Sequence, residues 1–490
     1  PPDSSGIVFP YYGGGGVLTV SGTGTRERSQ GAGITLCRRY AGHGEINVLG
    51  GMPDNGPGEI GMGGSNGTNG TAVLNLNGGT LITSTINYSY PFNPITNFLN
   101  FNGGTLRAFT NNVAFITNSI ANVVVNGPFG SFTGGAVIDT AGYDAGVLAN
   151  MVAPTGMGVS TLAVTDGGSG YIGEPYVSIA DSSGTGSGAT AIALMADDGT
   201  GKGTLRVASI KVTNPGVNYT DGSVTYTFAG GVPDVAATPG AVTLAANSSG
   251  GLTKLGEGIL SLSGANTYTG ATLVNAGTLA IDGSIGTAST VTVAAGRLAG
   301  NGTIGGPVFV QDNAALAPGN VIGTLTINNT LSLSANSSTL VDLDKGAATK
   351  DMVVATTVNY GGTLTVTNHT GTLAKDDAFQ LFSAGSYTGN FSQVVVAGST
   401  GTFDPATGIL TITSSSVAEY PTNISFELTQ PGQVALGWPE THRGWYAQSN
   451  ALDLANSAAW FDIPGSENLT NINITVDPAT PKVFYRLRKP

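Results

Sequence analysis

Three pairs of aspartates are the residues best suited to chemistry in this sequence of 490 residues. They are Asp197 with Asp198, Asp342 with Asp344, and Asp376 with Asp377, the last pair following Lys375. Paired carboxylates can divide the acid and base roles of glycoside cleavage, and a larger acidic cluster can bind Ca²⁺. No pair has a nearby group of further acids and an arginine. We therefore expect solvated turn carboxylates, with a weak structural calcium site as the alternative.

Two glycine motifs match catalytic or nucleotide-binding signatures by their letters. Residues 63–67, Gly-Gly-Ser-Asn-Gly, fit the G-x-S-x-G elbow of serine hydrolases. Residues 300–305 fit the G-x-G-x-x-G dinucleotide fingerprint. The first motif lacks a strand–turn–helix context. The second precedes Val308–Val310, which reads as a strand, whereas a bound pyrophosphate needs a helix N-terminus. We interpret both motifs as turns of a glycine-rich chain.

The histidines and the cysteine form no metal or redox motif. His43, His369 and His442 lie far apart in the sequence and show no metal-ligand spacing. Cys37 is the only cysteine, so it cannot form an internal disulfide. We expect it to be a small buried side chain, with an intermolecular bridge as the alternative. The sequence thus predicts no catalytic, cofactor-binding or metal-binding residue.

The charge and the apolar pattern of the chain exclude a nucleic-acid partner and a membrane-spanning helix. It has 18 Lys and Arg against 30 Asp and Glu, a net charge of −12. Nucleic acid binding needs clustered cations, and Arg26, Arg28, Arg38 and Arg39 form only two short basic spots. No apolar run approaches the roughly 18–20 residues of a membrane-spanning helix. We therefore expect no nucleic-acid partner and no membrane span.

Repeated short strands separated by glycines are the elements that would position these residues. Glycine accounts for 76 residues without a three-residue period, which excludes collagen, while apolar residues make up 40%. Residues 74–81 recur at 99–106, an offset of 25. Related Gly-Thr-Leu or Gly-Thr-Ile units follow at 277–279, 302–304, 323–325 and 362–364. A period of about 20–25 residues with alternating segments is typical of one coil of a β-solenoid.

We predict an all-β fold dominated by a right-handed parallel β-solenoid. Its inward side chains are expected to include Leu262, Leu273 and Leu279. The predicted units are N-terminal solenoid coils over 1–154, an inserted β lobe over 155–240, a second run of coils over 241–412 and a small C-terminal β-sandwich over 413–490.

The inserted lobe contains a duplication of its own. Residues 164–171 align with 212–219 at an offset of 48, and each copy ends in a tyrosine, Tyr171 or Tyr219. We expect each ring to be buried in its turn region with the hydroxyl at the edge, because a phenol combines a large apolar face with one polar atom. A ligand-stacking role for these tyrosines is the alternative.

One segment of the second run of coils resembles the autotransporter-associated β-strand repeat. It reads Leu-Thr-Lys-Leu-Gly at 252–256, Gly-Ile-Leu-Ser-Leu-Ser-Gly at 258–264, Asn-Thr-Tyr-Thr-Gly at 266–270 and Thr-Leu-Val-Asn-Ala-Gly-Thr-Leu at 272–279. This resemblance implies a passenger-type β-helix exported to the exterior of a Gram-negative-type cell, often for adhesion or aggregation. The segment from Leu436 to Arg488 is similar to C-terminal modules of exported proteins of the Verrucomicrobia, and that resemblance implies no catalytic residue.

Two functional hypotheses follow. The first is a non-catalytic structural or adhesive bacterial protein, extracellular or on the cell surface, which could also bind surface glycans. The second is a carbohydrate-binding or polysaccharide-degrading β-helix protein, with Trp438, Trp445 and Trp460 as sugar platforms.

Features near the N-terminus bear on export and on self-association. The chain begins Pro1-Pro2-Asp3 without an apolar leader, so we expect a removed leader or a missing N-terminal portion. Gly13–Gly16 leads directly into the strand pattern Val17–Val20, with no charged cap. The open edge of such a first coil can pair with another copy, so the sequence also predicts assembly into a homopolymer or filament.

Overall fold

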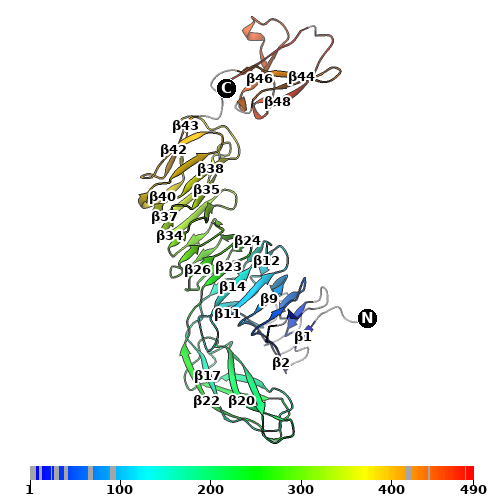
Figure 1. Cartoon of the computed structure of the whole chain (residues 1–490), viewed down its shortest axis with the longest axis vertical. Helices are drawn as coiled ribbons and strands as arrows, with labels where there is room; N and C mark the ends of the chain where they lie inside the picture. The colour runs from blue at the N-terminus through cyan, green and yellow to red at the C-terminus, as the bar shows by residue number, and fades with distance from the viewer. Residues whose placement is uncertain are drawn as a thin grey trace.

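The computed structural model describes residues 7–9, 14–23, 25–26, 33–37, 42–63, 70–88, 95–414, 422–439, 442–480 and 482–489. Across these residues the regular elements are β-strands and two short 3₁₀ turns, η2 (Ser457–Ala459) and η3 (Ser466–Asn468), with no α-helix. The strands stack into an elongated array with one lobe projecting from its side and a module at its C-terminal end (Figure 1). The fold is the predicted all-β parallel solenoid.

Two networks of strands, paired in parallel apart from one short antiparallel strand, form the walls of the solenoid. One is a fourteen-stranded sheet. Its members are β1 (Ile7–Phe9), β4 (Ile34–Leu36), β7 (Glu59–Met62), β10 (Thr85–Asn87), β12 (Asn112–Ile116), β15 (Ala145–Val147), β24 (Ile259–Leu262), β27 (Thr278–Ile281), β30 (Arg297–Gly300), β33 (Ala315–Pro318), β35 (Ser338–Asp344), β36 (Thr349–Lys350), β38 (Thr363–Asn368) and β41 (Gln393–Val396).

The second network continues around the coil. Its members are β2 (Gly14–Val20), β5 (Gly42–Val48), β8 (Thr71–Leu76), β9 (Thr80–Thr83), β11 (Thr96–Ala108), β13 (Asn122–Val125), β14 (Gly135–Asp139), β16 (Met151–Val152), β23 (Leu252–Leu255), β25 (Ala265–Asn266), β26 (Thr272–Val274), β28 (Ser284–Ile285), β29 (Val291–Val293), β31 (Thr303–Ile304), β32 (Val308–Val310), β34 (Thr324–Leu333), β37 (Met352–Tyr360) and β40 (Phe382–Gly389). Strands β11 and β34 each bend around a corner, because their two halves pair with different neighbours. A small extra pair joins β3 (Thr25–Arg26) to β6 (Met52–Pro53).

The strand register confirms the first repeat and corrects the later one. Leu74 pairs with Leu99 and Leu81 with Leu106, so the predicted offset of 25 is one coil. In the second run of coils the offset is shorter, because Leu279 already pairs with Leu298 of the next coil. The unit at 302–304 therefore stacks on residues 283–285 and not on 277–279, as the shared Gly-Thr letters had suggested.

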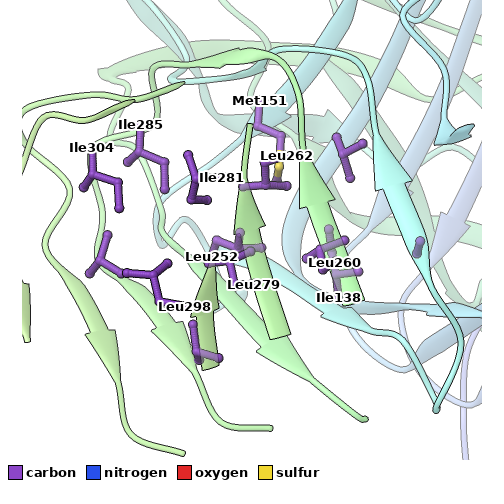
Figure 2. Close-up of a cluster of buried hydrophobic side chains, with 14 of the residues drawn as sticks. Ile138, Met151, Leu252, Leu260, Leu262, Leu279, Ile281, Ile285, Leu298 and Ile304 are labelled. Carbon is purple, nitrogen blue, oxygen red and sulfur yellow. The ribbon is translucent and has the colours of Figure 1, made fainter. Parts of the chain in front are cut away.

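Apolar side chains fill the solenoid from end to end. Leu260, Leu279 and Leu298 stack in consecutive coils and are fully buried, as Figure 2 shows. Burying one such side chain contributes roughly 1.5–3 kcal/mol. Leu262 is also inward, but the prediction for Leu273 is wrong. It is half-buried on the outer side of β26, because Thr272 and Val274 take the inward positions of that strand.

The lobe consists of two copies of a three-stranded unit. The first copy holds β17 (Met157–Asp166), β18 (Tyr176–Asp181) and β19 (Thr190–Asp197), and the second holds β20 (Leu205–Asn214), β21 (Val224–Ala229) and β22 (Thr238–Ala246). The offset of 48 that relates Tyr171 to Tyr219 also relates each strand to its counterpart. Exchanging the two copies turns the antiparallel pairing β17–β22 into β20–β19 and leaves the pairing β18–β21 unchanged. The lobe therefore has an approximate twofold axis between β18 and β21.

The duplicated tyrosines link the two copies. Tyr171 and Tyr219 are buried, with 1% and 6% of their surface exposed. The Tyr171 hydroxyl accepts the Ala237 N–H at 2.8 Å, and the Tyr219 hydroxyl accepts the Ala189 N–H at 3.2 Å. Ala189 and Ala237 occupy equivalent positions of the two copies, so both contacts obey the twofold. The prediction that both rings are buried is confirmed, whereas the Tyr171 hydroxyl lies inside the lobe and not at its edge.

A separate antiparallel sheet covers the C-terminal end of the solenoid. It contains β39 (Ala378–Gln380), β42 (Thr400–Asp404) and β43 (Ile409–Ser414). Phe403 of β42 packs edge-on against Tyr360 and Phe382 of the last two coils, with ring centroids 5.2 and 5.8 Å away. These aromatic contacts close the apolar core at that end.

The C-terminal module contains two three-stranded antiparallel sheets. One is β44 (Ser425–Gln430), β45 (Gln433–Gly437) and β48 (Asn471–Thr475), and the other is β47 (Phe461–Asp462), β46 (Tyr446–Asn450) and β49 (Phe484–Arg488). Leu436, Trp438, Ala447 and Ile472 form the buried centre of the module. This arrangement agrees with the predicted small sandwich.

Candidate functional site

The first aspartate pair caps a turn at the tip of the lobe. Asp197 accepts the Gly199 N–H at 2.7 Å. Asp198 accepts hydrogen bonds from the Thr204 and Thr200 hydroxyls at 2.6 and 2.7 Å, and from the Gly170 N–H at 3.0 Å. These donors, the Thr204 hydroxyl foremost, hold the pKa of Asp198 well below its usual value. Both carboxylates therefore serve the turn, as expected.

The other two pairs are divided among separate structural roles. Asp344 accepts the Ala347 N–H at 2.8 Å, while Asp342 pairs with His369 at 3.2 Å. Asp377 accepts the Ala374 N–H at 2.7 Å and forms an ion pair with Lys345, not with the adjacent Lys375. Across the part of the chain that the structure describes, no three His, Cys, Asp or Glu side chains are grouped to hold a metal ion.

The remaining predicted residues are also structural or lie outside the described ranges. Cys37 is fully buried, with its sulfur 2.8 Å from the Thr71 carbonyl, and burial raises its pKa to about 12. A buried thiol of this kind does not act as a nucleophile. His442 is 5% exposed and its ring lies 5.1 Å from that of Trp445. Residues 64–67 of the serine motif, with Arg38 and Arg39, lie outside the described residues. The 300–305 motif runs through β30 and β31 and leads into strand β32, as predicted.

The three tryptophans offer little open aromatic surface. Trp438 and Trp445 are 6% and 3% exposed, because they pack inside the C-terminal module. Trp460 is half-buried, and the Arg486 guanidinium lies 4.2 Å above its ring centroid. A sugar platform needs an accessible ring face, so the predicted platforms are not available in this arrangement.

Two rows of asparagines that the sequence analysis did not single out lie on the outer face of the coils that contain β5, β8, β11 and β13. Asn75 Nδ2 donates to Asn47 Oδ1, and Asn100 Nδ2 donates to Asn75 Oδ1, both at 2.8 Å. A second row lies two residues further along the strands. There Asn102 Nδ2 donates to Asn77 Oδ1 at 3.3 Å, and Asn126 Nδ2 donates to Asn102 Oδ1 at 2.7 Å. We call these two rows the covered ladders, since all six side chains are buried.

The lobe covers these ladders with the beginning of β19 and the end of β20. Thr190 Oγ1 accepts from Asn75 Nδ2 at 2.8 Å, and Asn214 Oδ1 accepts from Asn126 Nδ2 at 3.0 Å. The Thr213 carbonyl accepts from the amides of Asn77 and Asn102 at 2.6 and 3.1 Å. An amide stacked in a ladder has one N–H left over after bonding its neighbour. The lobe supplies the acceptors for these remaining donors, which water would otherwise have to satisfy.

An apolar strip accompanies the polar contact. Val73, Phe98 and Val124 are outward residues of three successive coils, and all are buried beneath the lobe. Gly188 approaches this strip at φ +80°, and a Cβ there would lie 2.9 Å from Phe98 Cε1. Only glycine combines that backbone angle with so close an approach. The lobe is therefore fitted to the solenoid by shape as well as by hydrogen bonds.

A crevice of about 510 Å³ opens beside this contact, between β2 and the lobe. Below it, His43 pairs with the buried carboxylate of Glu45 at 3.0 Å, and the Tyr176 ring lies 5.3 Å from the His43 ring. Glu174 lines the crevice, and its pKa is raised, first by burial and then by the charge of Glu45. One imidazole and two carboxylates therefore lie close together beside this crevice.

The covered ladders could be found only in part from the sequence. The offset of 25 places Asn75 on Asn100 and Asn77 on Asn102, and alternation with inward Leu74 and Leu76 turns all four amides outward. The acceptors on the lobe come from residues 88 to 136 positions away in the sequence. No local pattern links such distant residues, so the interface itself required the structure.

Comparison with known families agrees with the passenger-type resemblance. Residues 252–281 match the family model of the passenger-associated-transport-repeat. This segment contains β23 to β27 and spans parts of two successive coils, because β23 pairs with β26 and β24 pairs with β27 within it. No curated protein matches the chain. The resemblance of the C-terminal module to exported Verrucomicrobia modules stays a prediction. Within the described residues, none of the helical turns is long or apolar enough to cross a bilayer.

Proposed function

We propose that this chain is an exported, passenger-type β-solenoid with a non-catalytic structural or adhesive role outside a bacterial cell. The observation that carries the proposal is the position of the matched repeat at 252–281. Its strands pair in register with the coils before and after it, so that the repeat is part of a long stack and not an isolated unit. A passenger-type stack of this length is suited to extending attached parts away from a surface.

The proposed mechanism is mechanical. Backbone hydrogen bonds between successive coils run along the axis, and a continuous apolar core joins residues from Ile34 to Ile412. Local opening of one coil must expose core on both of its sides, which makes such a stack stiff and resistant to proteases. The lobe and the C-terminal module are the parts that this stack would present to a partner.

The contacts of the polar residues support the non-catalytic part of the proposal. Five of the six predicted aspartates bond within turns or pair with His369 or Lys345, and the polar groups of the covered ladders bind the lobe. The buried positions of Trp438 and Trp445 give no support to a sugar-binding platform in the C-terminal module.

The C-terminal end of the solenoid is covered, which opposes end-to-end stacking of copies there. Phe403 of β42 packs over Tyr360 and Phe382 at that end. Because the hairpin β42–β43 covers the last coils, we do not extend the proposal to filaments built by coil-on-coil addition.

Surface accessibility in intact native cells tests this proposal. An antibody raised against the lobe should label intact cells or the secreted fraction, and external protease should remove the label without degrading a cytosolic marker. Labelling that appears only after permeabilisation contradicts export. A panel of neutral and acidic polysaccharides tests the non-catalytic role, because reproducible release of reducing ends or unsaturated products by purified protein would contradict it.

A further inference from the structure

The twofold axis of the lobe duplicates the edge by which the lobe docks. In the docked edge, Thr190 at the start of β19 pairs with Asn214 at the end of β20. Their counterparts in the duplication are Thr238 at the start of β22 and Asp166 at the end of β17, and these two residues also pair with each other. Thr165 corresponds in the same way to Thr213. We call Thr165, Asp166 and Thr238 the free edge.

The free edge is accessible and keeps the acceptor chemistry of the docked edge. Thr165, Asp166 and Thr238 are exposed, whereas Thr213, Asn214 and Thr190 are buried against the solenoid. The substitution of Asp166 for Asn214 exchanges an amide oxygen for a carboxylate, which is the stronger acceptor. One Asp166 oxygen accepts the Gly168 N–H at 2.9 Å, and the carboxylate retains further lone pairs for another donor.

A second pair of ladders lies on the outer face of β34, β37 and β40. One row contains Thr330, Thr357 and Ser386, with the Thr357 and Ser386 hydroxyls 2.9 Å apart. The other row lies two residues further along. In it, Asn359 Nδ2 donates to Ser332 Oγ at 3.1 Å and Thr388 Oγ1 donates to Asn359 Oδ1 at 2.6 Å. We call these two rows the distal stripe.

The distal stripe has the same construction as the covered ladders. Both have two parallel rows of polar side chains, two residues apart, crossing three coils on the outer face of the second strand network, with amides in the covered ladders and mainly hydroxyls in the distal stripe. The difference is access, since Ser386 and Thr388 are exposed and the other four side chains are half-buried. The docked edge of the lobe already binds the amide donors of two such rows, and the distal stripe presents hydroxyls and one amide in the same arrangement.

We propose that the free edge of one chain docks onto the distal stripe of a second copy. Because the docked edge of the lobe is already occupied by the solenoid of the same chain, the free edge is the one left to bind a second copy. The Asp166 carboxylate, the Thr165 carbonyl and the Thr238 hydroxyl supply acceptors, and the stripe supplies donors. The two surfaces differ, so the contact is heterologous and each added copy presents a new stripe. This inference goes beyond the proposed function and does not depend on export.

Disulfide trapping in the full chain tests the contact directly. Asp166→Cys and Ser386→Cys place one thiol on each surface, and the native Cys37 is too buried to compete. After mild oxidation, the double variant should give a series of dimers, trimers and longer species on a denaturing gel. An equimolar mixture of the two single variants should stop at dimers. A double variant that remains monomeric, or one that cross-links no better than Thr225→Cys paired with Ser386→Cys, overturns the proposal.

Charge exchange provides a second, reversible test. In sedimentation at concentrations up to about 100 μM, we expect the wild type to associate, and Asp166→Lys should weaken association by about tenfold or more. Asn359→Asp should weaken it by placing two carboxylates in contact, and the combination with Asp166→Lys should restore it. Thr225→Lys, on an exposed position of β21, is the matched control and should leave association unchanged. A wild type that stays monomeric throughout, or a combination that does not recover, overturns the proposal.

Discussion

Replacing Asn75 of the covered ladders with alanine should weaken the docking of the lobe. The effect should be much larger than that of the same change at the more exposed Asn359 of the distal stripe. In Asn75→Ala, Asn47 Oδ1 and Asn100 Nδ2 each lose their bond to this side chain, and Thr190 Oγ1 loses one of its two. Asn47 and Asn100 are fully buried, so water cannot replace the lost partner. A buried group left unsatisfied costs about 1–3 kcal/mol, which gives about 2–6 kcal/mol for the two amides.

Hydrogen exchange is the assay best suited to this substitution, because a solenoid with an attached lobe need not unfold in one step. The amides of β19 and β20 should exchange roughly 30-fold faster or more in Asn75→Ala, following the lower end of that range of about 2 kcal/mol. Asn359→Ala is the matched control, since Asn359 also bonds both neighbours but is half-exposed. Water can replace its bonds, so its effect should stay below about 1 kcal/mol. Equal effects of the two substitutions would refute the argument from burial.

Three further predictions concern the solenoid core. Leu279→Asp should lower the free energy of unfolding by about 3–5 kcal/mol, because it buries an unpaired charge, whereas Leu273→Asp on the half-exposed face should cost far less in the same urea titration. Burial raises the pKa of Asp351 from 3.8 to about 6, so the folded state binds more protons between these values; stability should fall as pH rises from about 4 to 7, and Asp351→Asn should flatten that slope. Burial lowers the pKa of Lys254 from 10.5 to about 8, so the unfolded state binds more protons than the folded state in that interval. Stability against urea should therefore rise from pH 8 toward 10.5. An unchanged slope in Lys254→Met would show that Lys254 is not the group responsible.

The sequence was most informative where structure repeats with a constant local rule. Alternation and the offset of 25 predicted that Leu74 stacks on Leu99, and the offset of 48 predicted the paired roles of Tyr171 and Tyr219. Sequence reasoning failed where the same Gly-Thr pattern occurs at two different positions of a coil. The Gly-Thr-Ile unit at 302–304 looked equivalent to 277–279, but the shorter coils of that region moved it to the next corner.

Sequence reasoning also failed to predict which residues of a short strand point inward. Thr272-Leu273-Val274 turns a hydroxyl inward and a leucine outward, against the usual preference. The inward Thr272 hydroxyl is satisfied because it bonds both the Tyr268 and the Ser289 hydroxyls, at 2.7 and 3.0 Å. These three groups form a buried polar step that stabilises the less hydrophobic choice. Residue types alone do not reveal such a step, because its members come from different coils.

The insertion of the lobe bears on which surface of this stack is available for binding. Strand β14 pairs directly with β23, so Ala136 lies beside Leu252 as though the intervening lobe were absent from the chain. The coils therefore close without using any lobe residue, and the lobe depends on outward side chains for its position. A wall whose inward face is fixed by packing leaves only its outward rows free to vary. On the first coils those rows hold the lobe, whereas on the last coils the rows of the distal stripe are open. A partner could bind the distal stripe without any change to the packing of the core.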